Sequence, residues 1–249
     1  MKLEGKVAVV TGGGTGIGKA TSLLLAREGC DVVVNYSRSQ TEANETVAEI
    51  EALGRKAIAV QADISDESAV NAMFQAVDEK LGRVDILVNN AATTQFVPYT
   101  DLDGLTAEIW DKIFDVNVKG VFYCCREAIK RMKQHGNGSI VSVSSIAGMT
   151  GLGSSIAYAA SKAAVINMTR GLAASAAPEV SVNAVAPGVV ETRWIEGWEK
   201  FTDPHRDATP MKRHAQPEDV AAAIFGLILN PFTTGETIRV DGGRTLGAT

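Results

Sequence analysis

Short runs of apolar and β-branched residues recur along the whole chain. Most of them lack the polar–apolar alternation of a half-exposed strand, so we expect strands that are buried on both faces. The runs that predict strands are Val7–Thr11, Val32–Asn35, Ala57–Gln61, Asp85–Asn89, Ser139–Ser144, Ser181–Val185 and Glu236–Val240.

Segments with helical spacing separate these runs. Val70, Met73, Phe74 and Val77 follow the spacing of one helix face, and residues 43–53 carry a similar stripe. Further helices are predicted over Ile109–Met132 and Tyr158–Ala173. This alternation predicts an α/β chain of one domain, residues 1–249, with a doubly wound Rossmann fold: about seven parallel strands and helices on both faces. The only long irregular stretch, about 193–216, is typical of a functional loop.

Composition narrows the function classes. The 249 residues carry 24 Lys and Arg against 29 Asp and Glu, a net charge of −5, which disfavours a nucleic-acid binder. The three cysteines form no Cys-x-x-Cys pair, which favours reduced thiols and a cytoplasmic location. The longest apolar run, Ala221–Leu229, has about half of the ~20 residues of a membrane span. The three isolated histidines predict no metal site.

The first predicted strand leads into the glycine-rich stretch Thr11–Gly18, and a helical pattern follows it. Gly12, Gly16 and Gly18 have the spacing G-x-x-x-G-x-G. Glycine permits a tight turn and lets backbone N–H groups approach a pyrophosphate at a helix N-terminus. The alternative is a flexible turn without a ligand, but the position after the first strand favours a dinucleotide site.

The end of the second strand bears on the choice of dinucleotide. An acidic residue there would bind the ribose 2′-hydroxyl and repel a 2′-phosphate, but the sequence is Tyr36-Ser37-Arg38. Arg38 can pair with a phosphate and Ser37 can donate to it, which favours NADP(H) and leaves NAD(H) as the alternative. The other interpretation of Arg38 is a solvated loop cation.

Further motifs follow in order along the chain: Asn89-Asn90-Ala91-Ala92, Val116-Asn117-Val118, Ser144-Ser145, Tyr158-Ala159-Ala160-Ser161-Lys162 and Pro187–Thr192. With the glycine turn, they make nearly the whole chain resemble the short-chain dehydrogenase/reductase family. The pattern is closest to its 3-oxoacyl-[acyl-carrier-protein] reductases. Ala92 stands where the family usually has glycine, and Thr15 lacks the basic residue of many NADP-preferring members.

The resemblance implies four catalytic residues, Asn117, Ser145, Tyr158 and Lys162. Tyr158 would exchange a proton with the substrate oxygen, and Ser145 would hydrogen-bond to the same oxygen. Lys162, four residues from Tyr158 and so on the same helix face, would lower the pKa of Tyr158 and hold the nicotinamide ribose. Asn117 would anchor a water that links Lys162 to solvent.

The glycine motif and the resemblance also predict the ligand contacts. Asp63 would bind the adenine amino group, although it can instead be read as a helix N-cap. The predicted cofactor-binding residues are Gly12, Gly14, Thr15, Gly16, Ile17, Gly18, Tyr36, Ser37, Arg38, Asp63, Ile64, Asn89, Ala91, Tyr158, Lys162, Pro187, Gly188, Val190 and Thr192. The segments after the carboxyl edge of the predicted sheet should line the substrate pocket. Together with Ser145, the predicted substrate-binding residues are Gln95, Phe96, Ala147, Met149, Leu152, Val189, Trp194 and Trp198. The tryptophans can equally pack the lid, about 193–216, onto its own protein or a neighbouring subunit.

These observations favour an NADP(H)-dependent reductase of 3-oxoacyl thioesters carried on acyl carrier protein or coenzyme A. The alternatives are a sugar or secondary-alcohol dehydrogenase and a non-catalytic dinucleotide-binding sensor or scaffold, which the intact catalytic set disfavours. The basic run Arg126, Lys130, Arg131 and Lys133 either complements a helix dipole or docks an acidic carrier protein. The resemblance further implies a homotetramer, and no membrane or nucleic-acid partner is expected.

Overall fold

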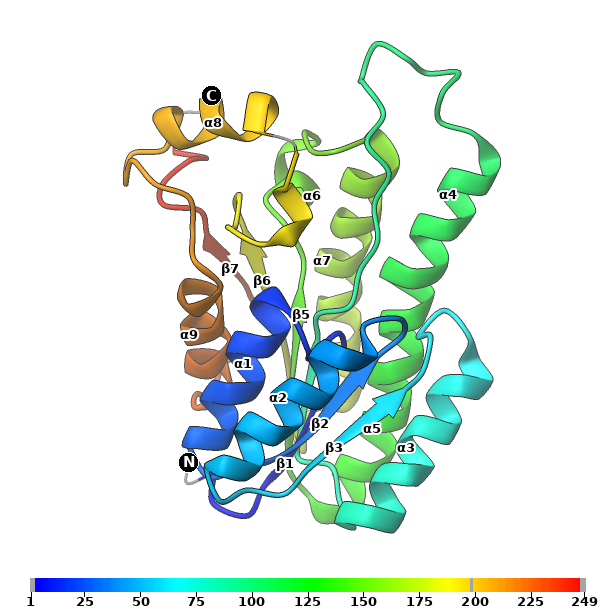
Figure 1. Ribbon diagram of the computed structural model, residues 1–249. Helices are drawn as coiled ribbons and strands as arrows, with labels where there is room; N and C mark the ends of the chain where they lie inside the picture. Colours follow the sequence, from blue (N-terminus) through cyan, green and yellow to red (C-terminus); the bar gives the residue numbers. More distant parts are fainter. Residues whose placement is uncertain (1–2, 198, 247–249) are drawn as a thin grey trace.

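The molecule is built around one parallel sheet of seven strands (Figure 1). The computed structural model describes residues 3–197 and 199–246. The strands lie in the order β3-β2-β1-β4-β5-β6-β7, and every neighbouring pair is parallel. Their bounds are β1 (Val7–Val10), β2 (Asp31–Tyr36), β3 (Ala57–Gln61), β4 (Ile86–Asn89), β5 (Gly138–Val143), β6 (Val180–Pro187) and β7 (Thr237–Val240). All seven predicted strands are confirmed.

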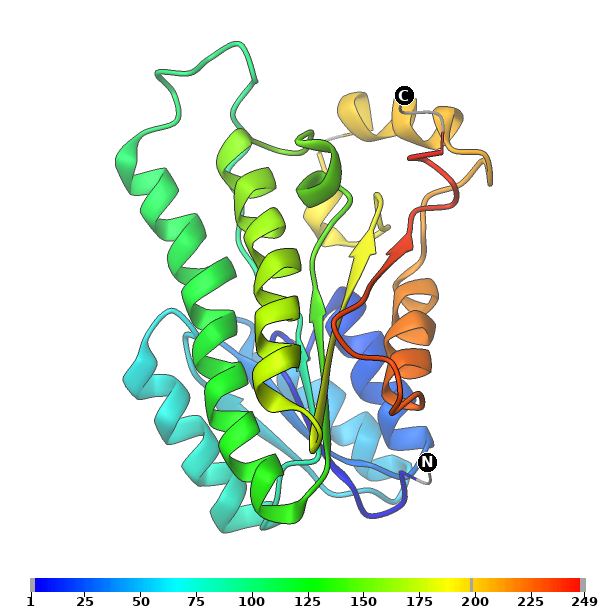
Figure 2. The ribbon, with the colours of Figure 1, turned by 180° about the vertical axis from the view of Figure 1, so that it is seen from behind.

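Helices cover both faces of the sheet. On one face lie α1 (Gly16–Arg27), α2 (Gln40–Ala52) and α9 (Pro217–Ile228). On the other lie α3 (Glu67–Leu81), α5 (Val121–His135) and α7 (Ile156–Ala176), which Figure 2 shows in cyan, green and yellow-green. Successive strand residues serve different cores: Ala8 and Val10 pack under the first set of helices, and Val7 and Val9 under the second. Burial on both faces explains the unbroken apolar runs in the sequence.

The long helix predicted over Ile109–Met132 is interrupted. The chain forms α4 (Ala107–Phe114), then a π-helical stretch, η1 (Asp115–Gly120), and then α5. At the end of this stretch, a Cβ on Gly120 would lie 2.7 Å from the Ile64 carbonyl oxygen, so the helix passes very close to the β3–α3 loop. The π turn contains Asn117, and such turns often occur at functional sites.

The strand order reverses between β1 and β4. In parallel α/β sheets, ligands bind at the carboxyl edge beside such a reversal. The glycine turn and most of the other predicted site motifs follow the carboxyl ends of strands, so the topology brings them to this one edge. None of the described helices is both long and apolar enough to cross a bilayer.

Candidate active site

The glycine turn after β1 is held from both sides. Asn35, on β2, accepts a hydrogen bond from the Gly12 N–H at 3.3 Å through Oδ1 and from the Gly13 N–H at 3.0 Å through its carbonyl. Directly after β4, Asn90 Nδ2 donates to the carbonyl oxygens of Thr11 and Gly12 at 3.0 and 3.1 Å. Asn35 and Asn90 were missed by the sequence analysis as site residues. The available signal was their position, since each follows a buried apolar run that flanks the first strand.

Steric fit explains why the turn needs glycine. A Cβ on Gly18 would collide with the Gly12 carbonyl oxygen, and one on Gly14 would lie 2.8 Å from Ala43 Cα. Gly16 has a φ of +50°, and its Cβ would lie 3.0 Å from Thr192 Cγ2. The backbone of the turn can therefore come close to a ligand without intervening side chains.

The N-terminus of α1 suits an anion. Thr15 is the N-cap residue of this twelve-residue helix, and its side chain makes no capping hydrogen bond. The first N–H groups of a helix have no partner within the helix and carry partial positive charge. These groups, together with the glycine turn, fit a dinucleotide pyrophosphate. Gly12, Gly14, Thr15, Gly16, Ile17 and Gly18 would hold it there.

The adenosine end of the site lies at β2 and β3. Ser37 and Arg38 are exposed, and within the described chain Arg38 makes no ion pair. Asp63 is also exposed, and one of its oxygens accepts from the Ser65 N–H and hydroxyl at 3.0 and 2.7 Å. The N-cap of α3 is Asp66 instead of Asp63, which removes the capping interpretation. Tyr36 and Ile64 are buried in the two cores, so their side chains mainly support the loops beside them.

Asn89 does not line the crevice as predicted. Its side chain is buried, and Nδ2 donates to Ser142 Oγ at 3.1 Å and contacts Cys125 Sγ at 3.2 Å. It therefore ties β4 to β5 and α5. The physical reason is strand alternation: Asn89, the last residue of β4, points into the helix layer, and the next residue, Asn90, reaches the glycine turn.

The three reacting groups predicted from the sequence meet at the end of β5. Ser145 follows this strand by two residues, and Tyr158 and Lys162 lie one turn apart on α7. Lys162 is almost completely buried, donates from Nζ to the Val143 carbonyl at 2.8 Å and lies 5.7 Å from the centre of the Tyr158 ring. Ser144 fixes the helix by donating to the Lys162 carbonyl at 2.8 Å.

Burial shifts the pKa values of both Tyr158 and Lys162. It raises the pKa of the Tyr158 phenol to about 12, and a hydrogen bond with Ser145 opposes the shift. Burial also lowers the pKa of Lys162 from 10.5 to about 8. Burial therefore raises the Tyr158 pKa in the chain alone, and the role of Lys162 in lowering it stays a prediction for the complex with cofactor.

Asn117 connects the active-site helix to a neighbouring loop. Its Oδ1 accepts from the Thr93 N–H at 2.8 Å, and its Nδ2 donates to the Thr93 carbonyl at 2.9 Å and to Ser161 Oγ at 3.0 Å. Both amide hydrogens are therefore used. The side chain positions the 93–99 loop against α7.

The predicted substrate side is formed by two loops that fold against each other. Tyr99 joins them, since its hydroxyl donates to the Gly151 carbonyl at 2.7 Å and accepts from the Gly153 N–H at 2.8 Å. Ala147 is buried, and its N–H donates to Ser145 Oγ at 3.1 Å. The other predicted contacts have varied exposure: Gln95, Met149, Leu152 and Trp194 are exposed, and Phe96 and Val189 are partly buried.

The 193–216 stretch is more ordered than predicted. It contains η2 (Arg193–Ile195), a 3-10 helix, and α8 (Glu199–Ala208). A parallel β-bridge between Val190 and Ala215 brings the two ends of this stretch together. Trp194 lies over the site, with its ring centre 6.4 Å from that of Tyr158. Trp198 lies outside the described residues.

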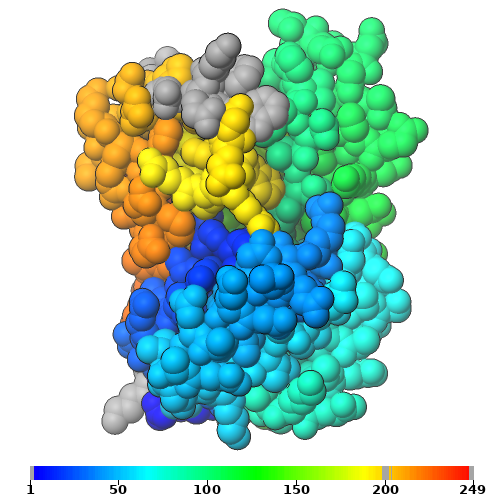
Figure 3. All heavy atoms as spheres, in the orientation of Figure 1, coloured from blue at the N-terminus to red at the C-terminus, as the bar shows by residue number. Residues whose placement is uncertain are grey.

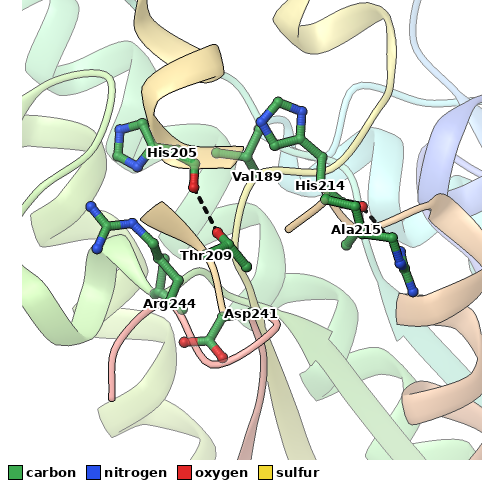
Figure 4. Close-up of a pocket in the computed structure, with 9 residues that line it drawn as sticks. Val189, His205, Thr209, His214, Ala215, Asp241 and Arg244 are labelled. Atoms are coloured by element: carbon green, nitrogen blue, oxygen red, sulfur yellow. Dashed lines mark hydrogen bonds between the residues drawn. The ribbon is translucent and has the colours of Figure 1, made fainter. Parts of the chain in front are cut away.

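A small cavity lies between this stretch and the C-terminal segment (Figure 4). Ile146 and Val189 supply apolar lining, and His205, His214 and Arg244 supply polar lining. His214 is buried and shares a 2.9 Å hydrogen bond with the Thr202 carbonyl. Among the predicted substrate residues, Val189 lines this cavity.

The basic run on α5 is compensated by acids. Arg126 pairs with Glu67 at 2.6 Å, Arg131 with Asp78 at 2.8 Å, and Lys130 with Glu127 at 2.7 Å. These pairs support the structural interpretation of the run and give no support to a carrier-protein dock there.

Comparison with known proteins agrees with this geometry. The short chain dehydrogenase family model matches residues 6–202. A 3-oxoacyl-[acyl-carrier-protein] reductase of Synechocystis is 41% identical over 98% of both chains, and one of Thermotoga maritima is 39% identical over 98% of this chain and 99% of that one. A solved short chain dehydrogenase from Burkholderia cenocepacia, in complex with NADP, is 37% identical with a TM-score of 0.91, covering 98% of this chain and all of that chain.

The chain therefore belongs to the short-chain dehydrogenase/reductase family. It is an oxidoreductase of a family that uses a nicotinamide dinucleotide. The sequence prediction of this family is confirmed, as is the likeness to 3-oxoacyl-[acyl-carrier-protein] reductases.

Proposed function

We propose that the chain reduces 3-oxoacyl thioesters with NADPH. The observation that carries this proposal is the meeting of Ser145, Tyr158 and Lys162 at the same edge of the sheet as the uncapped α1 N-terminus. The acid-free end of β2, with exposed Ser37 and Arg38, supports NADP(H) over NAD(H). The names of the Synechocystis and Thermotoga relatives support the substrate class.

The bound cofactor would supply the hydride that goes to the carbonyl carbon. Tyr158 donates its proton to the carbonyl oxygen, and Ser145 stabilises the charge that develops on that oxygen. A pKa of about 12 keeps Tyr158 protonated at neutral pH, which suits reduction. After the transfer, the Lys162 ammonium stabilises the phenolate, and a water held near Asn117 returns the proton.

The test is the initial rate of NADPH and NADH oxidation with an acetoacetyl thioester. We expect turnover that favours NADPH, and a loss of about 10²–10⁴-fold in Tyr158→Phe with little change in NADPH affinity. Trp110→Phe, a change of an aromatic residue on α4, serves as the matched control. Equal turnover by Tyr158→Phe would refute the assigned role, and turnover of sugars or secondary alcohols alone would refute the substrate class.

The proposal includes a substrate lid at 193–216 within a single domain, a homotetramer and a cytoplasmic location. Exposed Phe232 and Ile238 beside and on edge strand β7, and Phe122 on α5, supply apolar surface for two different subunit contacts. The three cysteines are buried and unpaired, in keeping with a reducing compartment. Sedimentation equilibrium tests the oligomer, and a monomer at micromolar concentration would refute it.

A further inference from the structure

Three consecutive residues after β6 contact three different parts of the site. Thr192 lies against Gly16 in the glycine turn, and Trp194 lies against the catalytic Tyr158. Arg193, between them, reaches across to the start of α2. Figure 3 shows this yellow segment meeting the blue surface formed by the residues after β2. The segment therefore spans the crevice from its adenosine end to its catalytic end.

The contacts of Arg193 place a cation at the adenosine end. Its Nη2 donates to Ser39 Oγ at 2.7 Å, and its Nη1 pairs with Glu42 Oε1 at 2.8 Å. Ser39 is the residue after Arg38 and the N-cap of α2, yet its hydroxyl makes no capping hydrogen bond. The thirteen-residue helix α2 thus presents an uncapped N-terminus beside Arg193 and the Ser37–Arg38 pair.

The pairing of Arg193 with Glu42 can be exchanged at little cost. The two side chains are 52% and 41% exposed, and exposed ion pairs contribute little to stability. A phosphate is a stronger partner, because the guanidinium can donate two parallel hydrogen bonds to it. Glu42, in contrast, would repel a phosphate in its vicinity.

We propose that Arg193 is a second cation for the 2′-phosphate of NADP(H), supplied by the segment after β6, so that NADP(H) anchors this segment across the crevice and NAD(H) does not. This inference rests on the proposed binding of the cofactor at the glycine turn. Arg38 approaches the phosphate from β2, and Arg193 approaches it from the opposite side of the crevice. The same segment holds Trp194 against Tyr158, so anchoring Arg193 links recognition of the adenosine end to the catalytic end.

Calorimetric titration with adenosine 2′,5′-bisphosphate and 5′-AMP tests the inference, since the two ligands differ only in the 2′-phosphate. In Arg193→Ala we expect about tenfold weaker binding of the bisphosphate and less than about twofold change for 5′-AMP. Glu42→Gln should bind the bisphosphate about two- to fivefold more tightly, because it frees Arg193 and removes a repelling charge. Arg213→Ala is the matched control: Arg213 belongs to the same stretch, is 50% exposed and pairs with Asp219.

The signs of these effects separate the outcomes. If Arg193→Ala and Glu42→Gln both weaken the two ligands equally, the pair is only a structural latch and the inference is overturned. If the unmodified protein prefers the bisphosphate and Arg193→Ala does not change that preference, the inference fails while the proposed cofactor stands. If the unmodified protein binds both ligands equally, the proposed NADP(H) preference fails together with the inference. Anchoring of the segment is read separately from a change in tryptophan fluorescence, which we expect with the bisphosphate and not with 5′-AMP, because neither ligand absorbs the emitted light.

Discussion

Replacing the buried Lys162 should stabilise the cofactor-free protein while it abolishes catalysis. The lysine pKa falls from 10.5 to about 8 on folding because burial disfavours the ammonium. Each pKa unit corresponds to about 1.4 kcal/mol, so at pH 7 the buried charge costs about 3 kcal/mol. Lys162→Met removes that cost and loses the hydrogen bond to Val143, worth about 1 kcal/mol. The net expectation is a gain of about 2 kcal/mol.

The pH dependence of folding stability tests whether the buried Lys162 charge is the cause. Between pH 8 and 10.5 the unfolded chain binds more protons at this lysine than the folded chain does, so the stability of the unmodified protein rises with pH. The advantage of Lys162→Met should therefore shrink from pH 7 to pH 9.5. Urea unfolding at 25 °C measures both values, and the exposed Lys80→Met is the control, with less than about 0.5 kcal/mol change at either pH. A Lys162→Met protein that is less stable at pH 7, or a gap that does not change with pH, would refute this reasoning.

Three further predictions test the support of the site. Asp85 is buried, and hydrogen bonds from Arg83 and Lys6 lower its pKa against the effect of burial. The stability that the Asp85 carboxylate supplies should therefore be lost as pH falls below about 4. Urea unfolding of Asp85→Asn should lack this part of the acid-induced loss of stability. Gly14→Ala should lower the free energy of unfolding by about 1–3 kcal/mol, because its Cβ would lie 2.8 Å from the Ala43 backbone. Gly171→Ala, in open space on α7, should raise the free energy of unfolding by about 0.5–1 kcal/mol. Equal effects of the two substitutions would contradict the steric argument. Asn90→Ala should raise the Kd for NADPH about tenfold with kcat nearly unchanged, because it loosens only the glycine turn; a fall in kcat alone would contradict this.

Much of the fold was predictable because its sheet is buried on both faces. An unbroken apolar run then marks each strand, and all seven predicted runs match the structure. The π turn at 115–120 was not predictable in the same way. The turn coincides with a tertiary contact, the passage of Gly120 against the Ile64 carbonyl, and the periodicity of α4 and α5 on either side does not record that contact.

The candidate site, like the fold, was predictable from the sequence only in part. Residue types and order predicted that Ser145, Tyr158 and Lys162 would come together. Which of Asn89 and Asn90 faces the crevice depends on the alternation of side chains at the end of β4, and the direction of the Tyr158 pKa shift depends on burial. Both are properties of three-dimensional packing that a motif does not carry.

The β-bridge between Val190 and Ala215 has a consequence for how this enzyme can change. It fixes the two ends of the lid against each other by main-chain pairing, independent of the side chains within the lid. The entropy of closing a loop grows only slowly with its length, about 0.6 kcal/mol for each doubling. Residues can therefore be inserted, removed or exchanged between these two anchors at small cost to the sheet. On the proposed function, exchange of the 193–216 stretch would change the substrate range while Ser145, Tyr158 and Lys162 stay in place.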